Sequence, residues 1–505
     1  PRFAVGESTI PYTSGMTRLI SERYGVPELK ALSSFKGIQE HVSRNCGRKQ
    51  NFGFVYHEEG RSQDPGQINQ LVVPSLLRTE SHLFRQDVDA YLFHVAVKYG
   101  AHPRLNTRIA DVEIDPEAGA VLRTDRGEEF RASYVIDGSG FRSPLAEKFE
   151  LRETPTRART NSRCLFTHMV GVTPFDDAPA ARHHDQPNPW HNGTLHHVFK
   201  GGWLWVIPFD NFPGAKNPLC SVGLTLDPRI YPKGDMSPQQ EFDAFLERFP
   251  EIAYQFKNAK SVRPWVSTGR LQYSAKQVVG ERFCLTSHAA GFIDALYSRG
   301  LTNTMELVNA LGWRLIAASR DGDWSYERFA YLEGLQQGLF DFHDDLVYSS
   351  FVGFDNYELW NAVCRTWMLG TMLGNVMLED AYYRYIKGGS ESVFLDLEQS
   401  VRPGSPFPVS DGFNELGVVT RDLCREVEGG SIAPEAAARQ ILTRIKDADF
   451  ISPAFRLGER DTRCFNMTPM KMAKNAIWCR REAPPQIGPR MIRASKGLVR
   501  MRVKE

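Results

Sequence analysis

The chain has 505 residues, a length that predicts more than one ordinary domain. Its 61 Lys and Arg residues balance 60 Asp and Glu residues and leave a formal charge of +1, which argues against a dedicated nucleic-acid binder. A hydrophobic fraction of 42% and a charged fraction of 24% are typical of folded globular proteins and exclude general disorder.

The cysteines and the apolar segments indicate the compartment. The 8 cysteines fall singly, with no CxxC pair, so neither a disulfide framework nor a metal site is expected, and a reducing cytoplasm is the simplest location. No run of about 18 apolar residues and no signal peptide is visible, so we expect no membrane association. The chain opens at Pro1 inside a candidate functional motif, and we expect a preceding segment to be missing from this sequence.

In chain order, residues 81–100 have apolar side chains at helical spacing, which predicts an amphipathic helix with Ser81 as its N-cap and Gly100 as its stop. Residues 108–115, 120–125 and 132–140 have the composition of short strands. The last of these strands ends in an acid and a glycine turn.

The middle and the end of the chain follow different patterns. Residues 160–285 alternate in polarity between Pro, Gly and Asp clusters, which predicts an antiparallel sheet. Residues 301–386 have helical periodicity, residues 388–412 are rich in turn formers and predict a long loop, and a further helix is expected at 434–446. The last residues, from 480, carry eight Lys and Arg against two Glu and predict a loosely ordered basic tail.

The clearest motif runs from Trp203 to Pro208, with the sequence WLWVIP. On a strand, Trp203, Trp205 and Ile207 would share one face, and Pro208 would end the ladder. Ordinary packing of a sheet against a core explains the pattern equally well. The WxWxIP pattern nevertheless resembles the signature of the flavin-dependent halogenases.

A second motif, FIDALYSRG, precedes a helical pattern and contains Asp294, Ser298, Arg299 and Gly300. Backbone N–H groups at a helix start favour an anion, such as a flavin edge, a halide or a peroxide oxygen. A plain loop-to-helix connection is the alternative. The run resembles the FxxPxxSxG motif of the same family, although Ala295 replaces the proline.

Other segments resemble elements that hold the flavin in this family. The start of the chain resembles the PRxxVGE strap, so Gly6, Glu7 and Ser8 are expected at the cofactor. Asp137 and Gly140 resemble a later flavin loop of class A monooxygenases, and Arg85 resembles a helix residue near the cofactor; the resemblance likewise places Asp294 among the cofactor-binding residues. Two features depart from the family: the GxGxxG βαβ unit is absent from this chain, and Ser287 and His288 replace a Gly-Asp pair.

The resemblance also indicates the reactive residue. Lys49, in CGRKQNFGF, falls where halogenases carry their essential lysine, and Lys36 is the rival candidate. The surrounding residues resemble phenolic halogenases of the pyoluteorin type, which act on phloroglucinol. Tyr297 stands where tryptophan halogenases have a glutamate, so the lysine is expected to lack an acidic partner there.

The family reaction makes hypohalous acid from reduced flavin, O2 and halide, and an internal passage leads that acid to the substrate. The resemblance therefore implies FAD, supplied as FADH2 by a separate flavin reductase, with O2 and chloride or bromide. A protonated lysine can polarise hypohalous acid, and a neutral lysine can trap it as an N-halo amine; the sequence leaves both roles open.

These observations predict an α/β protein with a class A flavoprotein monooxygenase-like FAD domain, an inserted antiparallel sheet and a helical C-terminal domain. The expected bounds are 1–155 with 281–325 for the FAD domain, 156–280 for the β-rich substrate region, 326–475 for the helical domain and 476–505 for the tail. The expected function is FADH2-dependent halogenation of a phenolic small molecule. A flavin-dependent aromatic hydroxylase and a non-catalytic remnant without FAD are the alternatives.

Overall fold

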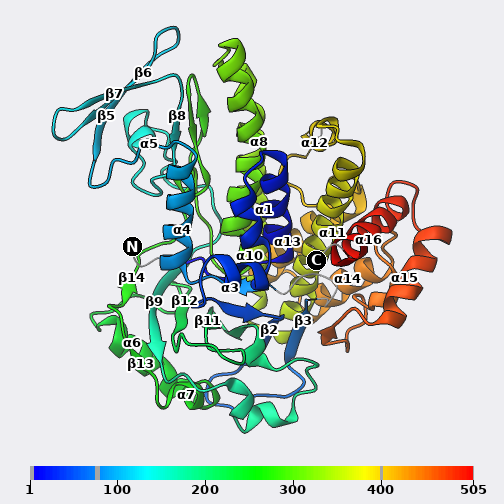
Figure 1. The fold of residues 1–505 in the computed structure, drawn as a ribbon. Coiled ribbons are helices and arrows are strands. Elements are labelled where there is room, and N and C mark those ends of the chain that lie inside the picture. Colours follow the sequence, from blue (N-terminus) through cyan, green and yellow to red (C-terminus); the bar gives the residue numbers. More distant parts are fainter. Residues whose placement is uncertain (1–4, 74–79, 399–401, 504–505) are drawn as a thin grey trace.

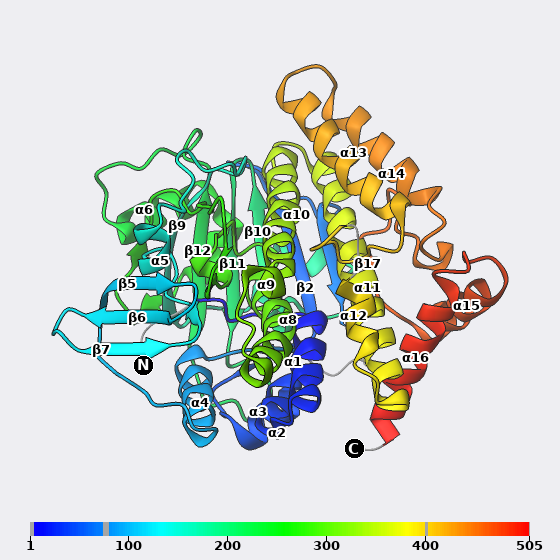
Figure 2. The ribbon, with the colours of Figure 1, turned by 90° about the horizontal axis from the view of Figure 1, so that it is seen from above.

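The computed structural model describes residues 5–73, 80–398 and 402–503 and has a mixed α/β architecture, as the sequence predicts (Figure 1). A large sheet forms one layer, and long helices lie against it (Figure 2). The helical C-terminal region lies beyond the edge of this sheet that ends in β17 (Cys464–Phe465).

Within the described residues, the large sheet has nine strands in the order β13-β9-β12-β11-β10-β2-β3-β17, with β14 paired to β9. Its longer strands are β2 (Asn51–His57), β3 (Ile68–Val72), β9 (Arg163–Val170), β10 (Thr194–Phe199), β11 (Gly202–Pro208) and β12 (Cys220–Leu226); β13 (Lys260–Ser261) and β14 (Val266–Ser267) are short. The strands from β9 to β12 pair antiparallel, which confirms the predicted sheet. The sheet is mixed, however, because β2 runs parallel to β10.

The strand β11 places alternate side chains on opposite faces, as the WxWxIP pattern predicts. Trp203, Trp205 and Ile207 join the core that contains α10 (Tyr331–Gly353) and α11 (Tyr357–Gly388). Leu204 and Val206 join the opposite core with α6 (Pro238–Arg248) and α7 (Pro250–Phe256). The sheet is therefore covered on both faces, which accounts for the complete burial of this strand.

In the part of the chain that the structure describes, three smaller sheets make up the rest of the named β structure. They contain β15 (Val279–Gly280), β16 (Phe283–Leu285) and β8 (Val135–Asp137); β5 (Ile109–Asp115), β6 (Gly119–Thr124) and β7 (Glu129–Ala132); and β1 (Gly47–Lys49) with β4 (Glu80–His82). The strands expected at 108–115 and 120–125 and the strand before the glycine turn are thus confirmed.

The expected helix at 81–100 is wrong at its start. Ser81 is not an N-cap but pairs with Arg48 inside the β1–β4 ladder, and the helix α4 begins only at Arg85 and ends at Lys98. The apolar periodicity of the segment could not reveal this boundary, because the strand pairing joins residues far apart in the sequence.

The remaining helices cover the sheet and build the C-terminal region. They are α1 (Pro11–Arg23), α2 (Pro27–Lys30), α3 (Phe35–His41), α5 (Pro144–Lys148), α8 (Arg299–Asp321), α9 (Tyr326–Phe329), α12 (Ser392–Glu398), α13 (Asp411–Glu428), α14 (Pro434–Lys446), α15 (Pro469–Arg481) and α16 (Gly488–Val503). The predicted helix at 434–446 is confirmed, whereas the loop predicted over 388–412 contains α12, and its residues 399–401 lie outside the described part.

The expectation of a loosely ordered basic tail is wrong. Residues 488–503 form the helix α16, which packs against α11, where Arg490 and Arg493 bind the buried carboxylate of Asp380. The positive charge that suggested a solvated tail thus has a buried acidic partner. None of the helices in the described ranges is long and apolar enough to cross a bilayer.

Candidate active site

Lys49 ends strand β1 and is fully buried. Its Nζ donates hydrogen bonds to the backbone oxygen of Thr9, at 2.9 Å, and to the Ser8 hydroxyl. The same nitrogen lies 3.2 Å from the centroid of the Phe52 ring. The strap and the β1–β2 segment therefore hold the amine in one place, away from bulk water.

Glu80 on β4 lies opposite Lys49 in the antiparallel register. Burial lowers the pKa of Lys49 well below its ordinary value, and the negative charge of Glu80 partly opposes that shift. Burial likewise raises the pKa of Glu80, whose Oε2 accepts hydrogen bonds from Thr9 and Ser14 at 2.7 and 2.6 Å. The lysine thus has a buried acid nearby, although not at the Tyr297 position that the sequence analysis considered.

A hydrogen-bond chain connects Lys49 with the WxWxIP strand. Ser8 Oγ lies 2.9 Å from Thr194 Oγ1, which lies 2.9 Å from His82 Nε2, and His82 Nδ1 lies 2.7 Å from the backbone oxygen of Pro208. Because a carbonyl oxygen only accepts, His82 Nδ1 carries the proton, and its Nε2 accepts from Thr194. Burial and the Lys49 charge lower the pKa of His82 to about 3, so its ring is neutral.

The rival lysine has a different environment. Lys36 lies on α3 with 78% of its side chain exposed and faces Glu40 at 3.9 Å. Such an i,i+4 surface pair is typical of a solvated helix face. Burial, hydrogen bonding and the Phe52 contact distinguish Lys49.

The other strap residues lie between the sheet and α4. Gly6 has a φ of +88°, and a Cβ there would lie 3.2 Å from the Arg85 guanidinium. Arg85 donates to the backbone oxygen of Val5 at 2.8 Å and binds Asp89 at 2.7 Å. Glu7 is buried, with Oε1 2.7 Å from His168 Nε2. The strap is therefore fixed by side chains from α4 and β9.

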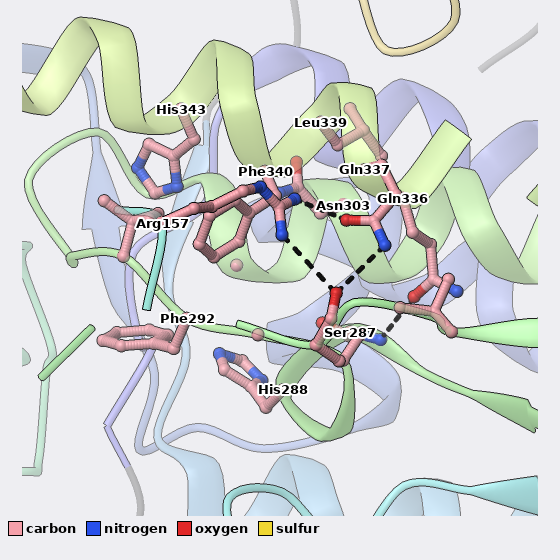
Figure 3. A pocket seen from close by; sticks show the side chains of 16 residues that line it. Arg157, Ser287, His288, Phe292, Asn303, Gln336, Gln337, Leu339, Phe340 and His343 are labelled. Atoms are coloured by element: carbon pink, nitrogen blue, oxygen red, sulfur yellow. Dashed lines mark hydrogen bonds between the residues drawn. The ribbon is translucent and has the colours of Figure 1, made fainter. Parts of the chain in front are cut away.

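A separate pocket lies at the start of α8, where Ser298 takes a left-handed conformation with a φ of 54°. Figure 3 shows Ser287, His288 and Phe292 on one side of this pocket and Phe340 and His343 of α10 on the other. Gly300 also lines it, and a Cβ at Gly300 would meet only the His288 ring, at 3.4 Å. We call this the α8 pocket.

Two polar atoms of residues that line the α8 pocket, and one atom of Arg299 next to Gly300 in the chain, have unused hydrogen-bonding capacity. Arg299 Nε, Asn303 Oδ1 and His343 Nε2 are buried and lack a hydrogen-bond partner among the described residues. Burial lowers the pKa of Arg299, and Glu306 and Tyr12 partly oppose that shift. Buried polar groups without partners are costly, which indicates a place for a polar ligand.

Asp137 and Gly140 belong to the loop after β8. Asp137 accepts hydrogen bonds from Ser139 and Ser143 and so organises its own loop. Arg152, which the sequence analysis missed, donates to the backbone oxygen of Gly140 at 3.2 Å and to that of Ala289 at 2.8 Å. One guanidinium thereby joins the two loops that resemble flavin-binding segments, a connection that only the fold reveals.

Asp294 and Tyr297 face the interior beside the WxWxIP strand. Asp294 accepts hydrogen bonds from Ser162 and from the backbone N–H of Leu296, both at 3.0 Å. Burial raises the pKa of Asp294 to about 6, although these hydrogen bonds and the Trp203 indole act to lower it. Tyr297 is fully buried and stacks on Trp367 at 4.9 Å. Neither residue lines the α8 pocket.

Comparison with known proteins identifies the family. The sequence profile described as tryptophan halogenase matches residues 69–331. Tetracycline 7-halogenase of Kitasatospora aureofaciens is 46% identical to this chain, and the aligned region covers 100% of this chain and 91% of the relative. Monodechloroaminopyrrolnitrin halogenase PrnC of Pseudomonas fluorescens is 48% identical, and the aligned region covers 91% of this chain and 81% of the relative.

The chain belongs to the tryptophan halogenase family. Among solved structures, the halogenase PltM in complex with phloroglucinol and FAD is similar, with a TM-score of 0.88, 31% identity and coverage of 92% of this chain and 93% of that one. The resemblance to flavin-dependent halogenases is confirmed, and this halogenase is an enzyme rather than a non-catalytic remnant.

Proposed function

We propose that this halogenase uses FADH2 from a separate flavin reductase, O2 and chloride or bromide to make hypohalous acid, and transfers the halogen through Lys49 to a phenolic substrate. The observation that carries the proposal is the amine of Lys49, which is fully buried, has a lowered pKa and is fixed by the strap. The proposal places the enzyme in the cytoplasm, consistent with its eight free thiols.

The residues present fit a flavin. Gly6 leaves the strap without a side chain beside Arg85, and the loop containing Gly140 has open space where a Cβ would stand. The unpartnered Arg299 Nε and Asn303 Oδ1 offer a donor and an acceptor near the α8 pocket. We propose that the strap, Arg85, the Asp137–Gly140 loop and the segment from Asp294 hold FAD, despite Ser287 and His288 at the position of the usual Gly-Asp pair.

When bound as FADH2, the flavin reduces O2 in the presence of halide and a proton and so supplies one hypohalous acid and one water. We place the halide at the Ser298–Gly300 turn. The first backbone N–H groups of α8 lack helical partners there, and the positive end of the helix dipole favours an anion.

Lys49 then controls where the electrophile goes. A neutral Lys49 attacks the halogen of hypohalous acid, releases water and holds an N-halo amine, which transfers the halogen to the ring and regains its proton from the ring carbon. A protonated Lys49 instead donates a hydrogen bond to the oxygen of hypohalous acid. Burial lowers the pKa of Lys49 and so favours the neutral amine more than in an exposed lysine.

Two observations support the proposal that the substrate is a phenol. Tyr297 fills the core against Trp367 and supplies no carboxylate to the substrate side. A phenol activates its own ring by oxygen donation and needs less help from a protein base. In addition, the similar PltM structure contains phloroglucinol.

The WxWxIP strand separates this proposal from aromatic hydroxylation. Trp203 and Trp205 are buried between the sheet and the helices, 5.5 Å apart, and their strand reaches the lysine through Pro208 and His82. In this proposal, the tryptophans keep a substrate at Lys49 away from the flavin. The substrate is therefore halogenated and not hydroxylated directly.

The decisive experiment compares Lys49→Ala with Lys36→Ala in the presence of reductase, O2 and halide. We expect Lys49→Ala to lose halogenated product while flavin reoxidation and hypohalous acid formation persist, and Lys36→Ala to keep activity because its side chain is exposed. An active Lys49→Ala protein would remove the lysine mechanism. A substrate panel tests the chemistry: faster halogenation of tryptophan than of resorcinol would overturn the phenolic assignment.

A further inference from the structure

Four methionines from separate segments of the chain line one cavity in the C-terminal region. The cavity has a volume of about 680 Å3 and is enclosed by β3, α11, α15 and α16 (Figure 2). Its methionines are Met372 on α11, Met467 just before α15, Met472 on α15 and Met491 on α16. We call these four residues the thioether cluster. The chain has 12 methionines, so a third of them meet at this one cavity.

Packing alone does not require sulfur at these positions. Methionine fills irregular gaps with a flexible apolar side chain, and leucine has a similar volume. The thioether adds a sulfur lone pair, which attacks electrophilic oxidants and so becomes a sulfoxide. Because a thioether has no proton to lose, this reactivity does not depend on pH. The cluster therefore has a chemical property that an ordinary apolar wall lacks.

A thiol lies in the same wall. Cys479 Sγ is 3.7 Å from Met491 Sδ. Burial raises the pKa of Cys479 to about 11, so its sulfur stays protonated near neutral pH and is a weaker nucleophile than a thiolate. The thioethers are then the reactive sulfur atoms of the cavity.

One aromatic ring separates the cavity from the reactive lysine. Phe52 lines the cavity, and the centroid of its ring lies 3.2 Å from Lys49 Nζ. Pro11 also lines it, two residues after Thr9, whose backbone oxygen accepts a hydrogen bond from the same nitrogen. Hypohalous acid is small and uncharged, so apolar walls do not repel it. Acid that leaves Lys49 on this side therefore meets the thioether cluster.

The same wall contains side chains that hypohalous acid would damage. The phenol ring of Tyr383 and the amines of Lys387 and Lys496 line the cavity. Halogen on a tyrosine ring forms a stable bond to carbon, whereas cellular reductases convert methionine sulfoxide back to the thioether. Oxidation of the cluster is thus reversible, and halogenation of the tyrosine ring is not.

We infer that the thioether cluster is a sacrificial sink, which consumes hypohalous acid whenever no substrate takes its halogen. A sulfur lone pair forms a bond to the halogen, and the halogen–oxygen bond breaks with its electron pair going to hydroxide. Water then adds to sulfur, halide leaves with the electron pair of the sulfur–halogen bond, and one of the two protons that the water loses neutralises the hydroxide. Sulfur loses two electrons, and the halogen gains them and ends as halide. This inference rests on the proposed function, which supplies the hypohalous acid.

The test is a map of methionine sulfoxide after turnover without an aromatic substrate. The full chain is supplied with FAD, reductase, O2 and chloride, then digested and analysed by mass spectrometry. We expect sulfoxide in the thioether cluster before it appears at Met236 and Met470, although these two residues are 53% and 67% exposed. Dilute hypochlorous acid added from solution to the resting enzyme should reverse that order. Earlier oxidation of the exposed pair during turnover would overturn the inference.

Met377 is the matched internal control. It lies on α11 five residues after Met372 and is buried, but it lines a different cavity. We expect at least about fivefold less sulfoxide at Met377 than at Met372. Omission of chloride, with catalase present to remove peroxide, should leave the cluster unoxidised. Equal oxidation of Met377 and Met372, or sulfoxide in the cluster without chloride, would overturn the inference.

Replacement of all four members of the cluster with leucine tests the protection itself. These substitutions conserve volume, so the initial rate of hypohalous acid formation should be unchanged. During turnover without substrate we expect chlorine on Tyr383 and inactivation about threefold faster, or more, than in the wild type. Met377→Leu should change neither. If melting shows that the fourfold variant does not fold, Met372→Leu combined with Met491→Leu takes its place; unchanged inactivation and an unmodified Tyr383 in a folded variant would contradict the sink.

Lys49→Ala distinguishes the inference from the proposed function. The proposed function expects loss of halogenated product, and the inference expects sulfoxide in the cluster at or above the wild-type level, because no lysine takes the halogen first. Full halogenation by Lys49→Ala together with oxidation of the cluster would contradict transfer through the lysine and support the sink. Loss of product with an unoxidised cluster and an oxidised Met470 would support the proposed function and overturn the sink.

Discussion

Lys49 and Glu80 face each other across two short antiparallel strands, and the charge state of the pair determines the chemistry of the amine. Since the negative charge of Glu80 raises the pKa of Lys49 against burial, Glu80→Gln should lower that pKa further. We therefore predict that the pH dependence of single-turnover halogenation moves to lower pH in Glu80→Gln.

The limb of the pH profile that moves reveals the role of the lysine. An N-halo mechanism needs neutral Lys49, so activity falls as pH drops through the pKa and the acid limb shifts. A hydrogen-bonding mechanism needs the protonated form, so the alkaline limb shifts instead. Glu40→Gln, which removes the exposed partner of Lys36, is the control and should leave the profile unchanged.

The sequence predicts Lys49 as the reactive residue but does not predict its surroundings. The lysine could be found because it falls within a motif of a known family. Glu80 and His82 could not, since their relation to Lys49 arises from the register of β1 with β4 and from hydrogen bonds to Thr194 and Pro208. Spacing along the chain contains no signal for such contacts.

At the scale of elements, the WxWxIP strand depends on a neighbouring glycine. A Cβ at Gly223 of β12 would lie 2.0 Å from the Trp205 indole, which crosses that position. We predict that Gly223→Ala displaces the indole and lowers the free energy of unfolding by about 1–3 kcal/mol, as overpacking does. Urea denaturation followed by tryptophan fluorescence measures the change.

Gly417→Ala on α13 is the comparison for that substitution, because a Cβ there meets nothing within 4 Å. It should leave stability unchanged or raise it slightly, since alanine favours a helix. Similar destabilisation by both substitutions would show that the Trp205 contact is not the cause.

The N-terminus of α8 allows a test of where halide binds. Because a Cβ at Gly300 would meet only His288, at 3.4 Å, Gly300→Ala should fold normally. If the halide sits at this turn, Gly300→Ala and, more strongly, Gly300→Val should raise the halide concentration needed for hypohalous acid formation. Unchanged halide dependence with intact flavin loading would contradict this position.

Element boundaries show where sequence reasoning stops. Long periodic segments such as α11 and α14 were predictable, because amphipathic repeats determine helices locally. The start of α4 was not, because the residues before it pair with β1. The helix α16 was read as a tail because its basic residues gave no sign of Asp380, which lies on α11 about 110 positions earlier.

At the scale of the whole molecule, the α8 pocket and a second, larger cavity are separate spaces with no lining residue in common. Strap residues near Lys49 contact α4 and the sheet, and the α8 pocket lies at the start of α8. The larger cavity, of about 680 Å3 and here called the C-terminal chamber, is lined by Phe52 and by residues of β3, α11, α15 and α16. Residues of α16 form one wall of this chamber.

The attachment of α16 is therefore the last feature to test. Arg490 and Arg493 bind the carboxylate of Asp380 at 3.2 and 2.5 Å, and this carboxylate is 1% exposed. Replacing both arginines with alanine leaves a buried acid without its partners, at a cost of about 1–3 kcal/mol. We predict faster hydrogen exchange in α16 and a lower free energy of unfolding.

Because the α8 pocket lies elsewhere, hypohalous acid formation should persist in the double variant. Arg481→Ala, which changes an exposed residue at the end of α15, should alter neither the hydrogen exchange of α16 nor the free energy of unfolding. If α16 exchanged no faster in the Arg490 and Arg493 double variant than in Arg481→Ala, the ion pairs with Asp380 would not be what holds this helix over the chamber, and apolar contacts with α11 would have to do so.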